Sequence, residues 1–97
     1  MTKEEILSKL KEHKSYIQER YGVKKIGLFG SYARNEAKEE SDVDIYVEFN
    51  EISFSKIAGL WNYLEDLYHK KIDLVRGGKL RKKSAIMDVI QKETIYI

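Results

Sequence analysis

The chain has 97 residues, which is enough for one small domain and too few for a second, substrate-holding one. Its 18 basic and 16 acidic residues leave a net charge of +2, far from the strongly basic balance of a general nucleic-acid binder. The absence of cysteine excludes disulfide frameworks, thiolate nucleophiles and Cys-based zinc sites. No signal peptide or membrane-spanning run is recognisable, so we expect a single domain over residues 1–97 in the cytoplasm.

A helix followed by a short strand is predicted for the N-terminal third of the chain. Thr2, with a glutamate three positions later, forms a capping box, and we expect the helix to end near Gly22. Its apolar positions share one face at helical spacing: Ile6, Leu10, Ile17 and Tyr21. The apolar run 23–29 then stops at Gly30, as a strand does where it meets a turn.

The stretch 42–49 alternates strictly, after a short, polar and helix-tolerant segment at 31–40. Such alternation predicts a half-buried strand with one polar face. The apolar face carries Val43, Ile45, Val47 and Phe49, and the other face carries Asp42, Asp44, Tyr46 and Glu48.

Helices and strands continue to alternate in the C-terminal half. Ser53 can cap a helix whose apolar stripe comprises Phe54, Ile57, Leu60, Trp61, Leu64, Leu67 and Tyr68. A third strand at 71–75 is ended by the glycine pair 77–78, a helix is expected over 80–92, and a terminal strand over 94–97. This order predicts one α/β domain.

Asp42 and Asp44 are two positions apart on the predicted strand, so their carboxylates project from the same face. Two such groups repel each other unless a cation lies between them. Mg²⁺ accepts oxygen ligands and keeps open positions for phosphates and water. The alternative is a pair of solvated aspartates, a residue type common at turns.

Gly30 and Ser31 lie upstream, where the first strand meets the helix-tolerant segment. Glycine allows close backbone approach, the N–H groups at a helix start attract phosphate, and the serine adds a hydroxyl donor. A Gly-Ser pair alone is only a common turn. Followed after ten residues by Asp-x-Asp, it arises by chance on the order of once in a thousand such chains. The combination predicts a nucleoside triphosphate site on divalent metal.

A third carboxylate, Asp73, lies within the predicted strand 71–75, where an unpaired charge among apolar neighbours is costly. If this strand lies beside strand 42–49, Asp73 joins Asp42 and Asp44 in a three-carboxylate, two-metal site for phosphoryl displacement. Alternatively, it pairs with a nearby basic residue, namely Lys70, Lys71 or Arg76.

The combination of Gly30-Ser31, Asp42-Val43-Asp44 and Asp73 resembles the minimal nucleotidyltransferases of the DNA polymerase beta superfamily, over residues 26–75. The resemblance implies a mixed sheet flanked by helices, with ATP as substrate and Mg²⁺ as cofactor, two ions in all. It assigns Asp42, Asp44 and Asp73 as catalytic metal ligands, and Gly30 and Ser31 as nucleotide contacts.

The implied reaction is attack of an acceptor hydroxyl on the α-phosphorus, with pyrophosphate leaving. One metal on all three aspartates lowers the pKa of the acceptor, and a second, shared by Asp42 and Asp44, grips the triphosphate. Asp73 is our candidate general base. Arg34 is a further candidate phosphate contact, with a merely solvated arginine as the alternative. Asn35 departs from the family pattern, which often has glycine there.

The acceptor must come from another molecule, because 97 residues leave no room to hold it. Minimal proteins of this type are typically encoded beside a HEPN-domain protein, an RNA-cleaving toxin, and act as its antitoxin by adenylylating a tyrosine. The resemblance therefore implies a HEPN toxin as partner. Two alternatives stay open: a non-catalytic nucleotide-binding antitoxin that occludes its partner, and a small-molecule adenylyltransferase.

Other polar and aromatic residues have weaker claims on function. Structural roles are favoured for His13 and His69, whereas Tyr16 and Tyr63 point away from the apolar faces and are candidates for a partner surface. A basic cluster near the last helix, Lys79, Arg81, Lys82 and Lys83, is either a solvated face or a contact for an acidic partner, RNA or the nucleotide.

Overall fold

The computed structural model describes residues 1–78 and 84–97. The helices are α1 (Lys3–Glu12), α2 (Lys14–Tyr21), α3 (Gly30–Ala33), α4 (Phe54–Tyr68) and α5 (Ala85–Glu93). The strands are β1 (Val23–Phe29), β2 (Val43–Phe49), β3 (Ile72–Arg76) and β4 (Ile95–Tyr96). The predicted α/β class and the order of the strands along the chain are confirmed.

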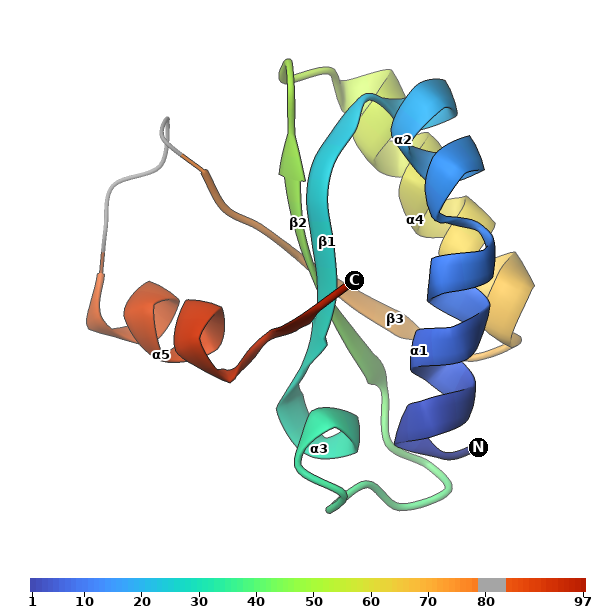
Figure 1. Ribbon diagram of the computed structural model, residues 1–97, viewed down its shortest axis with the longest axis vertical. Coiled ribbons are helices and arrows are strands. Elements are labelled where there is room, and N and C mark those ends of the chain that lie inside the picture. The colour runs from blue at the N-terminus through green and yellow to red at the C-terminus, as the bar shows by residue number, and fades with distance from the viewer. Residues whose placement is uncertain (79–83) are drawn as a thin grey trace.

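The strands form one mixed sheet in the order β3-β2-β1-β4, as the family resemblance implied. β1 is antiparallel to both β2 and β4, and β3 runs parallel to β2 after the crossover through α4. Helices α1, α2 and α4 lie on one side of the sheet and α5 on the other, with α3 at the end of β1 (Figure 1). The central strand β2 is therefore covered on one face by the layer of α1, α2 and α4, and in part on the other face by α5.

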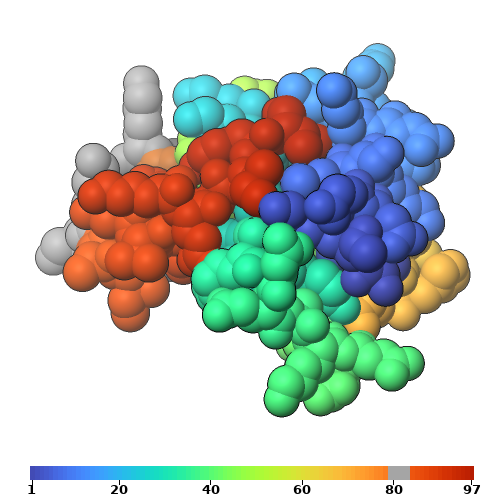
Figure 2. All heavy atoms as spheres, turned by 60° about the horizontal axis from the view of Figure 1, so that its bottom comes forward, coloured from blue at the N-terminus to red at the C-terminus, as the bar shows by residue number. Residues whose placement is uncertain are grey.

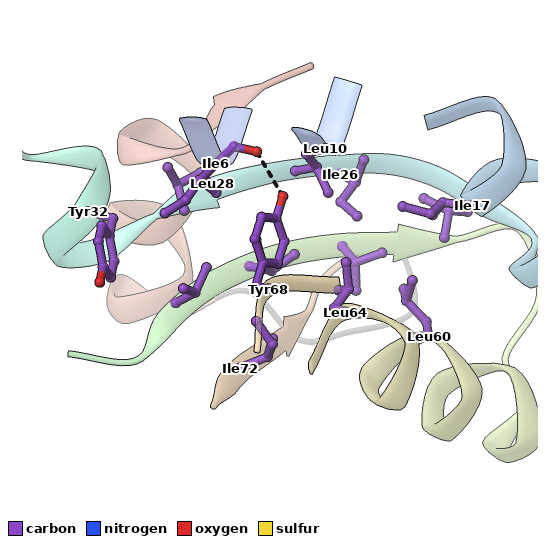
Figure 3. Packing of buried hydrophobic residues seen from close by; sticks show 14 residues of the cluster. Ile6, Leu10, Ile17, Ile26, Leu28, Tyr32, Leu60, Leu64, Tyr68 and Ile72 are labelled. Carbon is purple, nitrogen blue, oxygen red and sulfur yellow. Dashed lines mark hydrogen bonds between the residues drawn. The ribbon is translucent and has the colours of Figure 1, made fainter. Parts of the chain in front are cut away.

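The main core lies between the sheet and the layer of α1, α2 and α4 (Figure 3). Its fully buried side chains include Ile6, Leu10, Ile17, Ile26, Leu28, Ile45, Leu60 and Leu64. The hydroxyl of buried Tyr68 donates to the carbonyl oxygen of Ile6 at 2.8 Å, which joins the end of α4 to the start of α1. Burial of this apolar surface is the main stabilising contribution to the fold.

A second, smaller cluster lies under α5 and corrects one prediction. The strand 42–49 was expected to have a polar outer face, but Tyr46 on that face is 0% exposed. Met87 of α5 and Phe29 of β1 pack against it. Helix α5 covers only part of this face, so that Tyr46 is buried whereas Asp44 stays partly accessible.

The predicted first helix is broken at His13, whose backbone (φ −97°, ψ 2°) separates α1 from α2. The hydroxyl of Tyr63 on α4 hydrogen-bonds to Nδ1 of His13 at 2.8 Å, which ties the break to the neighbouring helix. The capping box at Thr2 and the left-handed end at Gly22 (φ 65°) are confirmed.

The predicted stripe of α4 is wrong at two positions. Phe54 is 88% exposed and Trp61 is 37% exposed, because a helix lying on a sheet buries only the centre of a wide apolar stripe. The indole N–H of Trp61 instead donates to the carbonyl oxygen of Ile72 at 2.8 Å, on the edge strand β3. The cap at Ser53 is confirmed, since its side chain accepts the N–H of Lys56.

The C-terminal elements can be compared with their predicted bounds only within the described residues. Ser84 caps α5, which begins at Ala85, while positions 80–83 of the expected helix lie outside the described part. Thr94 ends the helix with an extended backbone, and the terminal strand spans only Ile95–Tyr96. No helix of residues 1–78 or 84–97 has the length and apolar character to cross a membrane.

The Tyr68 hydroxyl offers a test of how α1 is joined to α4. Tyr68→Phe removes a buried hydrogen bond and should lower the free energy of unfolding by about 1 kcal/mol in urea titrations. The control is Tyr96→Phe, which removes an exposed hydroxyl that donates to the Gln91 carbonyl oxygen at 3.3 Å. Water can replace this exposed hydrogen bond. Equal stability of the two variants would contradict a structural role for the buried bond.

Candidate active site

Asp44 and Asp73 lie directly opposite each other in the parallel pairing of β2 and β3. Their side chains are close enough to hydrogen-bond, which the two carboxyl groups can do only by sharing a proton. The strands that carry Asp44 and Asp73 are therefore neighbours, as the prediction of a three-carboxylate site required. The register of the sheet thus places two carboxylates on one face of adjacent strands.

The turn at Gly30 is built around Asp44. Phe29, the last residue of β1, pairs with Asp44 in the antiparallel register, and the chain turns immediately afterwards into α3. Gly30 has φ 78°, and a Cβ placed on it would lie 2.0 Å from Oδ2 of Asp44. Only glycine fits this position, both for its backbone conformation and for the room that the carboxylate needs.

The backbone N–H of Ser31 acts on the Asp44 carboxylate by favouring its charged form. The two halves of the predicted motif, the Gly-Ser turn and the aspartate strand, therefore meet at Asp44. The sequence predicted that they share a site but gave no sign of how closely they approach, because only the register of β1 against β2 brings them together.

Burial raises the pKa of Asp44 to about 6, and the charge of Asp73 contributes in the same direction. The Ser31 N–H opposes the rise, and Asp42 adds a smaller upward effect. From the sequence we expected Asp73 to be the buried charge. The structure shows that Asp73 is exposed and that Asp44 is the partly buried carboxylate.

The pair fits a hard divalent cation in its donor chemistry. Both groups offer carboxylate oxygens, and a cation would relieve the repulsion that raises the Asp44 pKa. Asp42, just before β2, is near enough to act on Asp44 by its charge. Even so, within residues 1–78 and 84–97 no three acidic, His or Cys side chains converge as a ready-made metal site. Asp42 would have to move toward the pair to complete the predicted ligand set.

Arg34, the predicted phosphate contact, is bound to two carboxylates. It caps the end of α3, and its guanidinium donates to Glu36 at 2.5 Å and to Glu93 of α5. Asn35 follows with φ 59°, a left-handed conformation that asparagine tolerates and that suits the glycine often found there. The basic cluster Lys79, Arg81, Lys82 and Lys83 lies outside the described residues.

A polar network beside the carboxylates was missed in the sequence. The Tyr46 hydroxyl donates to Glu48 at 2.6 Å and accepts from the Gln91 side chain of α5 at 3.0 Å. A Cβ on Gly77 would lie 2.2 Å from that hydroxyl, so the glycine after β3 leaves room for the ring. The network anchors α5 over the same sheet face that carries Asp44.

Replacing Gly30 tests the close approach of Asp44. Gly30→Ala should lower the free energy of unfolding by about 2 kcal/mol or more, through backbone strain plus displacement of the carboxylate. The control Gly22→Ala shares the left-handed backbone (φ 65°), but its nearest side-chain atom is the flexible Lys56 Nζ at 3.5 Å. It should lose only about 1 kcal/mol. If both variants lost the same free energy of unfolding in thermal or urea denaturation, the contact with Asp44 would not contribute to stability.

Asp44→Asn should stabilise the metal-free protein at neutral pH. Because folding raises the Asp44 pKa from 3.8 to about 6, ionisation costs stability fully above pH 6 and not at all below 3.8. After discounting for solvent screening, we expect a gain of about 1 to 2 kcal/mol at pH 7.5 in chelator that fades as the pH falls toward 4. The exposed Asp66→Asn serves as control for unfolding measured across this pH range. A loss of stability in Asp44→Asn at pH 7.5 would contradict the assigned repulsion.

Comparisons with known proteins place this site in a family. The model of the nucleotidyltransferase domain matches residues 10–97. The chain is 49% identical over 98 residues to the protein adenylyltransferase MntA of Thermococcus cleftensis, covering all of this chain and 97% of the relative. These matches confirm the resemblance found in the sequence.

Solved structures share the fold. A candidate minimal nucleotidyltransferase superposes with a TM-score of 0.78 at 31% identity, over 98% of this chain and 95% of that one. A toxin-antitoxin structure with AMP-PNP gives 0.66 at 21% identity, over 88% and 69%. The complex of a tri-AMPylated Shewanella oneidensis HEPN toxin with its MNT antitoxin gives 0.59 at 22%, over 93% and 68%. The last two show likeness of fold. With the family model, the relative and the paired carboxylates in agreement, the chain belongs to the nucleotidyltransferase domain family and is a nucleotidyltransferase.

Proposed function

We propose that this chain is a Mg²⁺-dependent protein adenylyltransferase that transfers AMP from ATP to a tyrosine of a HEPN toxin and neutralises it as its antitoxin. The observation that carries the proposal is the pairing of Asp44 with Asp73 beside the Gly30-Ser31 turn. It is supported by a relative, matched over 97% of its own length, that is named a protein adenylyltransferase. Structures of similar fold contain AMP-PNP in one case and an AMPylated HEPN toxin in another.

The residues of this chain divide into two groups in the proposed site. Asp42, Asp44 and Asp73 would hold Mg²⁺, which supplies charge neutralisation at the triphosphate and acidifies a bound hydroxyl. Gly30 keeps the backbone close to the phosphates, and the Ser31 hydroxyl donates to them. The Ser31 N–H favours the charged form of Asp44, so we assign its contribution to that carboxylate.

The transfer moves one proton and exchanges one bond for another. The acceptor oxygen forms a bond to the α-phosphorus while the bond to the pyrophosphate oxygen breaks. Asp73 takes the hydroxyl proton, since it is exposed on the edge strand β3 and can be reached by an acceptor from solvent. Pyrophosphate leaves toward the Gly30-Ser31 turn.

Label transfer tests the proposal directly. The protein is incubated with α-labelled ATP, Mg²⁺ and the HEPN-domain protein encoded beside it, and label on that protein is measured after denaturing gel separation. Wild type should label its partner, and Asp44→Asn should lower the rate roughly a hundredfold or more, because an oxygen ligand and its charge are lost. Asp66→Asn, an exposed aspartate on α4, should keep the wild-type rate.

Other outcomes would favour the competing functions. If wild type left no label on the partner and Asp44→Asn still neutralised the toxin fully, the protein would act by steric occlusion and not by catalysis. Label on a small molecule, with none on the partner, would assign a small-molecule adenylyltransferase. Partner mapping by mass spectrometry identifies the acceptor, and label on a residue type other than tyrosine would correct that part of the proposal.

A further inference from the structure

An ion-pair bridge joins the Gly30-Ser31 turn to the helix that covers the catalytic face. Arg34, at the end of α3, donates from Nη1 to Oε1 of Glu93, the last residue of α5. The two residues are 59 positions apart, so this bond ties separate elements together. Its second bond, from Nε to Glu36, spans only two positions and stays local. Segments α3 and α5 lie side by side on the surface (Figure 2).

The burial of the two carboxylates differs. The Glu93 side chain is 21% exposed, compared with 63% for Glu36. A partly desolvated ion pair interacts more strongly than an exposed one, so Glu93 is the firmer partner. Two carboxylates around one guanidinium leave a local surplus of negative charge, which does not attract a triphosphate. In this arrangement Arg34 acts as a tether.

Helix α3, a single turn of helix, connects the tether at Arg34 to Gly30. The N–H of Arg34 donates to the carbonyl oxygen of Gly30 at 3.1 Å and closes α3. On the opposite side, buried Tyr32 anchors the same four residues in the main core. With Tyr32 on one side and Glu93 on the other, α3 is fixed between the two layers of the molecule. Its first residue, Gly30, is the one that contacts Asp44.

We propose that Glu93 is a positioning residue for nucleotidyl transfer: through Arg34 it holds the Gly30-Ser31 turn in the orientation that receives the triphosphate. The inference rests on the proposed function for the identity of the nucleotide. It makes α5 part of the support of the site, although no residue of α5 belongs to the family motif quoted above. The alternative, in which Arg34 leaves Glu93 to bind phosphate, changes nucleotide affinity in the opposite direction.

Glu93→Gln and Glu36→Gln form a matched pair, because each removes one carboxylate from the same guanidinium. Calorimetric titration of the acceptor-free protein with ATP and Mg²⁺ should show a dissociation constant raised roughly two- to fivefold in Glu93→Gln. The change in Glu36→Gln should be smaller, since that bond does not reach α5. About 1 M NaCl should remove the difference between wild type and Glu93→Gln by screening the bridge.

Amide hydrogen exchange gives a second readout that does not depend on nucleotide. Glu93→Gln should speed exchange in residues 31–34 without nucleotide, whereas Glu19→Gln, an exposed glutamate of α2, should leave it unchanged. In the label-transfer assay, the Glu93 variant should raise the KM for ATP more than it lowers kcat.

Three results would overturn the inference. Tighter nucleotide binding in Glu93→Gln would mean that Glu93 withholds Arg34 from the phosphates. Equal effects of the two glutamine variants would mean that only the charge near Arg34 matters. Unchanged exchange in residues 31–34 would mean that the bridge does not hold the turn. Failure of the proposed function is distinguishable, because a protein that binds ATP without labelling a partner still allows the calorimetric and the hydrogen-exchange measurements.

Discussion

The close approach of Asp44 to Gly30 is the constraint on which the site depends. A carboxylate oxygen occupies the space where any other residue would carry its Cβ, and the next N–H, from Ser31, favours the charged form of that carboxylate. This contact fixes the turn relative to β2. Since β2 also holds Asp44 opposite Asp73 on β3, one residue joins the Gly30-Ser31 turn to the carboxylate pair. The register of three strands therefore determines the geometry of the candidate site.

The main core and the candidate site lie on opposite faces of the sheet. On one face, α1, α2 and α4 bury the apolar side chains that stabilise the fold, whereas the other face is covered only in part, by α5 (Figure 1). The uncovered part holds a partly buried aspartate whose pKa rises to about 6 beside a second carboxylate. Such an arrangement costs stability in the absence of a cation and favours binding of one. Perturbed carboxylates of this kind are typical of functional sites.

The sequence predicted the proximity of Gly30, Asp44 and Asp73 better than it predicted the packing around them. Gly30, Ser31 and the three aspartates carry a motif that can be read from spacing, and alternation in 42–49 was sufficient to place Asp44 on the accessible face. The same alternation could not show that Tyr46 is covered, because α5 reaches it from the far end of the chain. The Arg34–Glu93 pair is likewise invisible in a sequence, since it spans 59 positions and depends on the packing of α3 against α5. Contacts distant in sequence were missed wherever no motif marked them.

The proposed function depends above all on whether the Asp44–Asp73 pair binds a cation that serves nucleotide transfer. Its most direct test is a crystal structure of the protein grown with Mn²⁺ and a non-hydrolysable ATP analogue, in which anomalous scattering locates the metal. We expect a Mn²⁺ peak bound by Asp44 and Asp73, with Asp42 drawn in to complete the ligands and the triphosphate against the Gly30-Ser31 turn. An analogue bound elsewhere, or carboxylates without Mn²⁺ at saturating concentration, would contradict it.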